Sequence, residues 1–206
     1  MKSQKINKEK IEKKIILEQA LEIIENENIK KLSMRNIAAK CNFSATKLYY
    51  YYECKDHIII SLIEEGFKTI NNRIKQKLSD KNSPKDNFIN AINETYLFSN
   101  EKKHHFNIMF GINTQKFLDK DEIIPSTFIN SHAEILKDNE EEFYQIICNL
   151  VKNYVNKDKE FTFSILSLFL GSFLLKSKKT IEKLHSYNEN NFKITMQYII
   201  LLCEQQ

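Results

Sequence analysis

The sequence predicts an all-α protein with a small N-terminal helix-turn-helix domain and a larger C-terminal helical domain. Three observations support this fold class. The 206 residues include only three glycines and two prolines, so few positions would interrupt a helix. Apolar residues recur at helical spacing in much of the chain. A hydrophobic content of 42% is enough for a substantial core, and the length suits one small and one medium domain.

Two short helices joined by a tight turn are predicted between Leu32 and Tyr52. Ser33 precedes one short apolar-periodic run and Ser44 precedes another, so each hydroxyl is placed to cap a helix. Leu48 and Tyr52 are spaced i to i+4, and we expect both to face the core. The second helix has the size that fits the major groove of DNA, so the pair is a candidate DNA-reading element.

Five short segments in the first quarter of the chain follow one another in a specific order: ILEQALEII, LSMRNIA, FS, LYYYY and KD. In this order and spacing the chain resembles the tetracycline-repressor-like (TetR) family of bacterial transcription regulators. That family usually has glycine after its first helix and in the turn of the motif, where Asn28 and Asn42 stand here. Asparagine tolerates the left-handed backbone that both places need. Glu53 departs from a position that is often basic in the family, and Cys54 replaces the usual capping residue.

The motif implies which side chains meet DNA. By position, Arg35 and Thr46 are candidates for contacts with base edges, and Ala45 is able to touch a thymine methyl group. Tyr50 is a candidate for either bases or phosphates. The candidates for phosphate contacts are Ser33, Ser44, Lys47, Tyr49, Tyr51 and Lys55.

The charge distribution agrees with a DNA-binding domain at residues 1–56. This segment holds 12 Lys and Arg residues and 8 Asp and Glu residues, whereas residues 57–206 hold 19 of each kind. The whole formal excess of +4 therefore lies where phosphate contacts are expected. The alternative is that lysines are simply frequent in this composition.

Residues 57–206 are expected to form a ligand-binding and dimerisation domain. Apolar spacing predicts one long helix, at roughly 55–79, that would join the two domains and could carry a ligand signal to the DNA-reading helix. Ser83 and Pro84 then mark the start of a helix at about 84–99. Further helices are expected at about 102–118, 126–136, 139–156, 160–178 and 188–204.

The middle helices would hold a pocket for a small hydrophobic or amphipathic effector, if one exists. For any single aromatic residue there, ordinary core packing is the alternative. The candidate pocket residues are Tyr96, Phe106, Met109, Phe110, Phe117 and Tyr144.

The last two predicted helices are apolar around most of their circumference and must be covered on all sides. The alternatives are a central core helix within one subunit and a two-fold four-helix interface, where the resemblance also places the dimer contacts. Two-fold symmetry would set two DNA-reading helices about one DNA turn apart, ~34 Å or somewhat more, and would select a palindromic operator. The candidate interface residues are Leu166, Phe169, Leu170, Phe173, Tyr198, Ile199 and Leu202.

Other functional classes find little support. His104 and His105 are adjacent and would point to different helix faces, and no glycine-rich phosphate loop or serine elbow is visible. The longest apolar block, residues 161–175, is shorter than the ~20 residues that span a bilayer. The N-terminus lacks the apolar segment of a signal peptide, and the four cysteines form no close pair, as expected for reduced thiols in the cytoplasm. We therefore expect no enzyme activity, no cofactor, no metal and no membrane partner.

The function expected from the sequence is that of a homodimeric, cytoplasmic, ligand-responsive repressor that binds double-stranded DNA. Its partners would be a palindromic operator, a small-molecule effector and a second copy of the chain. The alternative is a DNA-binding regulator controlled by a protein partner or acting without a small-molecule effector.

Overall fold

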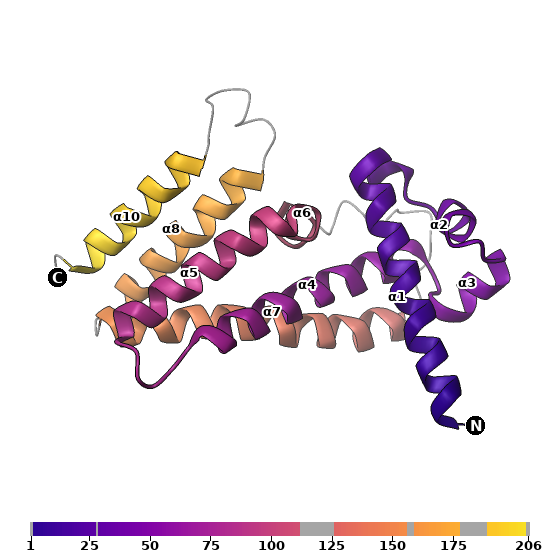
Figure 1. Cartoon of the computed structure of the whole chain (residues 1–206), viewed down its shortest axis with the longest axis horizontal. Helices are drawn as coiled ribbons and strands as arrows, with labels where there is room; N and C mark the ends of the chain where they lie inside the picture. Colours follow the sequence, from indigo (N-terminus) through magenta and orange to yellow (C-terminus); the bar gives the residue numbers. More distant parts are fainter. Residues whose placement is uncertain (1, 28, 112–125, 156–158, 178–188, 205–206) are drawn as a thin grey trace. The chain divides into compact units, whose positions relative to one another are not determined.

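The structure, a computed structural model, describes residues 2–27, 29–111, 126–155, 159–177 and 189–204. Within these ranges the regular secondary structure is helical and includes no β-strand (Figure 1). The all-α prediction is therefore confirmed. The chain divides into two compact units, which we call the N-terminal unit (residues 1–65 and 113–136) and the C-terminal unit (residues 66–112 and 137–206).

The N-terminal unit is built around the inner face of its first helix, α1 (Lys2–Glu27). Ile16, Ala20 and Ile23 recur at spacings of four and three residues and are fully buried, as one helix face should be. A short 3-10 helix, η1 (Ile29–Lys31), leads to α2 (Met34–Cys41) and α3 (Ala45–Tyr51). The apolar residues that complete this core are Leu32, Ile37, Ala38, Leu48, Tyr52, Ile58, Ile59 and Leu62.

Local hydrogen bonds set the ends of the two short helices. Ser33 Oγ accepts the backbone N–H of Asn36 at 3.2 Å, and Ser44 Oγ accepts that of Lys47 at 3.1 Å. Asn42 has φ 56° and ψ 37°, a left-handed conformation, and its N–H donates to Ala39 O at 3.1 Å. Both serine caps and the left-handed Asn42 are thus confirmed, and they fix the turn between α2 and α3. Asn28 lies outside the described residues.

Helix α4 (Lys55–Lys77) contributes to both units, its first turns to the N-terminal unit and the remainder to the C-terminal unit. A single linking helix was expected at roughly 55–79, and the structure ends it two residues earlier. In the C-terminal unit, Gly66 lets α6 approach α4 closely. A Cβ atom at Gly66 would lie 2.4 Å from Met109 Sδ, so any larger residue would displace the Met109 side chain.

The C-terminal unit continues with α5 (Pro84–Glu101), α6 (Lys103–Gly111), α8 (Lys159–Ser177) and α10 (Glu189–Glu204). Helix α7 (Ser126–Val155) belongs to this unit from residue 137 onwards, and its first turns belong to the N-terminal unit. Ser83 Oγ accepts the N–H of Asp86 at 3.1 Å and Pro84 occupies the first turn, so the predicted start of α5 is confirmed. The prediction of separate helices at 126–136 and 139–156 is wrong. Neither glycine nor proline occurs between Ser126 and Val155, so nothing interrupts α7.

Aromatic rings form the centre of the C-terminal unit. The ring centroid of Phe67 on α4 lies 5.6 Å from that of Phe110 on α6 and 5.9 Å from that of Phe143 on α7. The rings of Phe106 and Phe110 are tilted towards each other with centroids 4.8 Å apart. The side chains of Phe67, Phe106 and Phe143 are fully buried, so this cluster binds three helices together.

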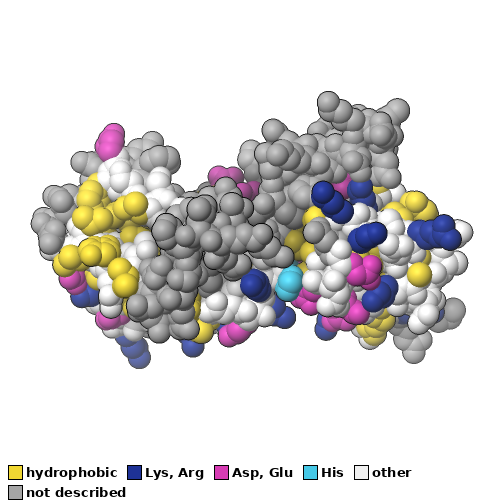
Figure 2. Space-filling model, turned by 90° about the horizontal axis from the view of Figure 1, so that it is seen from above, with side chains coloured by type: hydrophobic (Ala, Val, Ile, Leu, Met, Phe, Trp, Pro, Cys, Tyr) yellow, Lys and Arg dark blue, Asp and Glu magenta, His cyan; other side chains and the backbone are white. Residues whose placement is uncertain are grey.

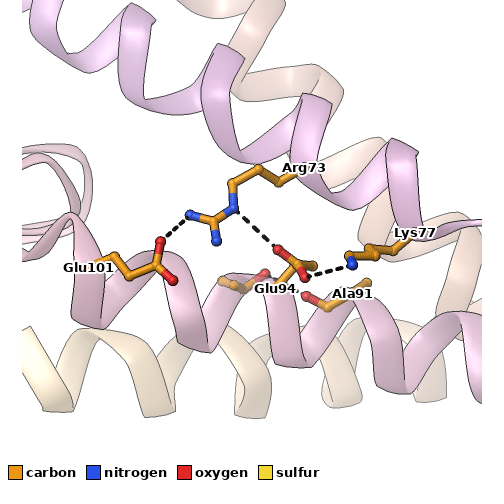
Figure 3. A network of polar contacts seen from close by, with 6 residues as sticks. Arg73, Lys77, Ala91, Glu94 and Glu101 are labelled. Atoms are coloured by element: carbon orange, nitrogen blue, oxygen red, sulfur yellow. Dashed lines mark hydrogen bonds and ion pairs between the residues drawn. The ribbon is translucent and has the colours of Figure 1, made fainter.

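Polar contacts also fix the second half of α4 to its neighbours. Arg73 donates from Nε to Glu94 Oε2 at 3.2 Å and from Nη1 to Glu101 Oε2 at 2.8 Å, joining α4 to α5 (Figure 3). On the α7 side, Asn71 Nδ2 donates to Glu142 Oε2 at 2.9 Å, and Lys75 pairs with the same carboxylate. This part of α4 is therefore held from two directions within the C-terminal unit. Nowhere in the described ranges is a helix long and apolar enough to cross a membrane.

Candidate nucleic-acid interface

Helix α3 has one buried face and one open face. Leu48 and Tyr52 are buried, as predicted for the core side of the helix-turn-helix. On the open face, Tyr49 is 53% exposed and Tyr50 is 66% exposed, with Ala45 and Thr46 beside them also exposed. Two large aromatic side chains left open on so short a helix indicate a surface that contacts another molecule.

The predicted residues outside α3 lie at the starts of neighbouring helices. Ser33 is the N-cap of α2, Arg35 is exposed in the first turn of α2, and Lys55 is half-buried in the first turn of α4. Ser33 and Ser44 each accept one backbone N–H, and a serine hydroxyl that accepts such a bond still has its own hydrogen to donate. The capping geometry is therefore compatible with a further bond to an anionic oxygen.

Three predicted residues of α3 contact acidic side chains of α1. Lys47 Nζ lies 2.8 Å from Glu12 Oε1, and the hydroxyl of Tyr51 donates to Glu12 Oε2. The hydroxyl of Tyr50 donates to Glu9 Oε1 at 3.1 Å. Lys47 Nζ also lies 3.7 Å from the centroid of the Phe43 ring, within cation–π distance.

These contacts change the acidity of the groups involved. Hydrogen bonds from Lys47 and then Tyr51 hold the pKa of Glu12 below its usual value of 4.5. Because Tyr51 donates to this carboxylate, its own pKa is raised to about 12. At neutral pH Glu12 is therefore ionised and Tyr51 keeps its proton.

Glu9 and Glu12 were not among the predicted functional residues. A signal for them exists in the sequence, because Glu9, Glu12 and Ile16 follow at three- and four-residue spacing along the face that becomes the core. Carboxylates on the helix face that packs against a neighbouring helix need hydrogen-bond donors from that neighbour. The partners, however, are 35 to 41 residues away in the chain, which helical spacing does not reveal.

The sequence that forms α2 and α3 matches a known family. The sequence model of bacterial regulatory proteins of the tetR family matches residues 16–62. This range begins at the buried part of α1, contains all of α2 and α3, and ends in α4.

Residues 16–62 of this chain are therefore similar to the bacterial regulatory proteins of the tetR family.

Solved structures of tetR-family proteins share the fold over nearly the whole chain. A tetR-family bacterial regulatory protein from Rhodococcus RHA1 is 13% identical with a TM-score of 0.67, covering 94% of this chain and 95% of its own. A TetR-family transcriptional regulator from Bordetella parapertussis 12822 is 14% identical with a TM-score of 0.65, covering 93% of each chain. The fatty acid degradation regulator FadR from Bacillus halodurans is 12% identical with a TM-score of 0.63, also covering 93% of each. No curated protein matches this chain in sequence.

The matched range includes the whole helix-turn-helix, which agrees with a DNA-binding role for the N-terminal unit. In the ranges that the structure describes, no group of three or more His, Cys, Asp or Glu side chains could hold a metal ion.

The predicted effector-pocket residues occupy different environments. Phe106 and Phe110 belong to the aromatic cluster, and Met109 lies against Gly66. The ring of Tyr144 meets that of Phe143 edge to face, and its hydroxyl donates to Glu140 Oε1 at 3.2 Å. Phe117 lies outside the described residues. Tyr96 lines a groove of about 220 Å³ between α5 and α10, together with Ile89, Ile92, Asn93, Met196, Gln197 and Ile200.

The predicted dimer-interface residues also differ in their exposure to solvent. Tyr198 and Leu202 on α10 are exposed, whereas Phe169 on α8 and Ile199 on α10 are buried within the subunit. The side chains of Leu166, Leu170 and Phe173 lie outside the description. Hydrophobic side chains gather over the end of the C-terminal unit that carries α10 (Figure 2). The large hydrophobic residues of α8 and α10 that are exposed are Leu168, Ile194, Tyr198, Leu201 and Leu202.

Proposed function

We propose that this tetR-family regulator is a cytoplasmic, homodimeric repressor that α2 and α3 anchor to a palindromic DNA operator and that a small hydrophobic effector releases. The open face of α3, with Tyr49 and Tyr50 exposed beside Ala45 and Thr46, is the observation that carries the DNA-binding part. These side chains surround a helix whose start is capped by Ser44, so they are presented in a defined geometry. The four cysteines, all of which the structure describes, form no disulfide bond, in keeping with a reducing compartment.

On DNA, the open face of α3 would enter the major groove. Thr46 and the exposed Arg35 would read base edges, Ala45 would touch a thymine methyl group, and Tyr50 would reach either bases or phosphates. The remaining candidates, which are Ser33, Ser44, Lys47, Tyr49, Tyr51 and Lys55, would hold phosphates and fix the register of the helix. The domain boundary that we propose, with DNA binding in residues 1–56, places all of these side chains in one domain.

A dimer would cover the exposed apolar residues of α8 and α10. Leu168, Leu201 and Leu202 each leave a large part of an aliphatic side chain in water, and Tyr198 is 63% exposed. Contiguous exposed apolar surface of this kind favours association, and a two-fold axis through it would duplicate α3. Phe169 and Ile199 would support this surface from inside the subunit.

The effector would act through α4, which both units share. We propose that it binds among the middle helices, at or beside the groove that Tyr96 lines. The groove volume of about 220 Å³ is below the ~300–1,000 Å³ of typical ligand pockets, so binding would require the groove to widen. Movement of α4 would change the spacing of the two α3 helices, and effector and DNA would weaken each other by ~1–3 kcal/mol.

The DNA-binding proposal is tested by incubating the purified chain with randomised duplexes and sequencing the retained DNA. We expect enrichment of a palindromic sequence. Genomic fragments captured by the same protein would identify the regulated sites. Failure to enrich any duplex sequence at low salt would contradict the proposal.

The dimer is tested by sedimentation of the wild type and of two α10 variants. Tyr198→Asp places a charge in the proposed interface and should shift the chain towards a monomer. Gln197→Asp adds the same charge to the neighbouring exposed residue outside the predicted interface set and should leave the dimer intact. A monomeric wild type at micromolar concentration would contradict the dimer.

A thermal-shift screen separates an effector from the alternative mode of control. A compound that raises the melting temperature and releases DNA supports the effector. If no compound does so and a specific protein is captured instead, control by a protein partner is the better explanation.

A further inference from the structure

The inner face of α1 carries acidic side chains just before Ile16, its first buried apolar residue. Ile16 is fully buried, Glu12 lies four residues earlier on the same face, and Glu9 lies three residues before Glu12. The side chain of Glu12 is only 13% exposed although it is ionised. The apolar stripe of α1 is thus extended by two carboxylates that face α3.

The carboxylate of Glu12 accepts hydrogen bonds from two side chains of α3 at the same time. Its Oε1 accepts from Lys47 Nζ at 2.8 Å, and its Oε2 accepts the hydroxyl hydrogen of Tyr51. One turn away, Glu9 accepts the hydroxyl hydrogen of Tyr50 at 3.1 Å. An anionic carboxylate with two acceptor oxygens makes the same kind of charge-assisted bonds that a DNA phosphate would make to these side chains.

The Glu12 carboxylate and a DNA phosphate cannot both accept a hydrogen bond from Tyr51. A phenol has one O–H hydrogen, so Tyr51 cannot donate to a phosphate while it donates to Glu12. At Lys47, a carboxylate at 2.8 Å cancels the positive charge that would otherwise displace counterions from DNA. Glu12 itself brings a negative charge next to residues that are proposed to meet the phosphate backbone.

We infer that Glu12, assisted by Glu9, competes with DNA phosphates for Lys47 and Tyr51 and thereby sets the DNA affinity of this regulator. This inference rests on the proposed DNA-binding function of α3. It makes Glu12 an affinity-determining residue that lies outside the helix-turn-helix itself. Removal of its charge leaves Lys47 and Tyr51 free to bind phosphates.

The test compares Glu12→Gln with Glu18→Gln in the full-length chain. Both substitutions remove one negative charge from α1, but Glu18 is exposed and pairs with Lys14 at 3.7 Å instead of with α3. Binding to the selected operator is measured by fluorescence anisotropy between 50 and 200 mM salt. Glu12→Gln should bind roughly tenfold tighter at the lowest salt, and its slope of log K against log [salt] should steepen by about 0.9, the value for one added phosphate contact. Glu18→Gln should stay within about twofold of the wild type, with an unchanged slope, because an exposed charge away from the contact is screened by salt.

Lys47→Ala in both backgrounds shows whether the gain passes through the proposed contact. In the Glu12→Gln background Lys47→Ala should abolish most of the gain, whereas in the wild type its effect should be smaller, since Lys47 is already neutralised. Additive effects of the two substitutions would overturn the inference. So would equal or weaker operator binding by Glu12→Gln whose folding is confirmed by circular dichroism.

A readout without DNA tests the contact itself and remains usable if Glu12→Gln binds poorly. In protein labelled at the tyrosine ring carbons, NMR titration should give Tyr51 a pKa near 12 in the wild type and a lower pKa in Glu12→Gln. An unchanged Tyr51 pKa would contradict the contact and the competition that follows from it. If the wild type binds no duplex, the proposed function fails as well, whereas operator binding that Glu12→Gln leaves unchanged overturns this inference alone.

Discussion

The guanidinium Nε of Arg73 lies 3.2 Å from Oε2 of Glu94, and this ion pair joins α4 to α5 in the C-terminal unit. Glu94 is 11% exposed at its side chain, and its other carboxylate oxygen lies 3.9 Å from Lys77 Nζ (Figure 3). The pair therefore satisfies a carboxylate that would otherwise be buried with only a distant cation. It also fixes the half of the shared helix that an effector would have to move.

Arg73→Met should lower the free energy of unfolding by about 2 kcal/mol, because it leaves Glu94 with Lys77 alone. The expected loss is smaller than the ~3–5 kcal/mol for one partner of a fully buried pair, since Arg73 is partly exposed. Urea denaturation followed by circular dichroism measures it. Glu101→Gln removes the exposed partner of the same guanidinium and should cost clearly less, because solvent screens an exposed ion pair. Equal losses for the two variants would contradict the importance of burial at Glu94.

Arg35→Ala should weaken binding to the operator more than binding to random DNA, relaxing base preference by ~1–3 kcal/mol, because Arg35 is proposed to read a base edge. Lys47→Ala should weaken both kinds of DNA by the same factor, as expected for a phosphate contact. The comparison uses the selected operator and a scrambled duplex of equal length and composition. An Arg35→Ala variant that loses equally on both duplexes would refute the base contact.

Asn42→Ala should destabilise the N-terminal unit by ~1–2 kcal/mol, because alanine pays the full steric cost of a left-handed φ of 56°. Asn42→Gly is the matched variant and should be as stable as the wild type or slightly more stable, because glycine adopts this conformation freely. Thermal and urea unfolding of the two variants measure the difference. If alanine and glycine proved equivalent, the left-handed turn would not be needed for stability.

His105 should make stability fall on acidification. Burial, with smaller effects from Lys102 and His104, lowers the pKa of His105 to about 4 from a usual value of 6.5. The unfolded chain therefore binds the proton more readily between these values, and stability is lost as the pH falls from about 6.5 to about 4. His105→Phe should reduce this pH dependence relative to the wild type in urea denaturation at several pH values. The neighbouring His104→Gln serves as the control and should retain it.

Local features of this protein were readable in the sequence. The caps at Ser33, Ser44 and Ser83 involve atoms within three residues of one another, so residue type and position sufficed to predict them. Leu48 and Tyr52 are buried as their four-residue spacing predicts. The left-handed turn followed from an asparagine standing where the family usually has glycine.

Longer-range features could not be predicted in the same way. Two helices were predicted where the structure has the single helix α7. Two stretches of apolar spacing do not imply two helices when no helix breaker lies between them. Phe106 and Phe110, which remain candidates for the effector pocket, belong to an aromatic cluster with Phe67 and Phe143 that joins three helices. Helical periodicity identifies an inward face but does not identify what that face meets.

By itself, the sequence determined the helical class and the helix-turn-helix, because these depend on interactions between residues a few positions apart. The order of its N-terminal motifs also revealed the similarity to the tetR family. The tertiary structure alone decided that Lys47 and Tyr51 meet Glu12, that Arg73 meets Glu94, and which aromatic residues are enclosed. Each of these contacts joins residues more than 20 positions apart in the chain. Their energies depend on how two helix surfaces fit together, and local propensity contains no information on that fit.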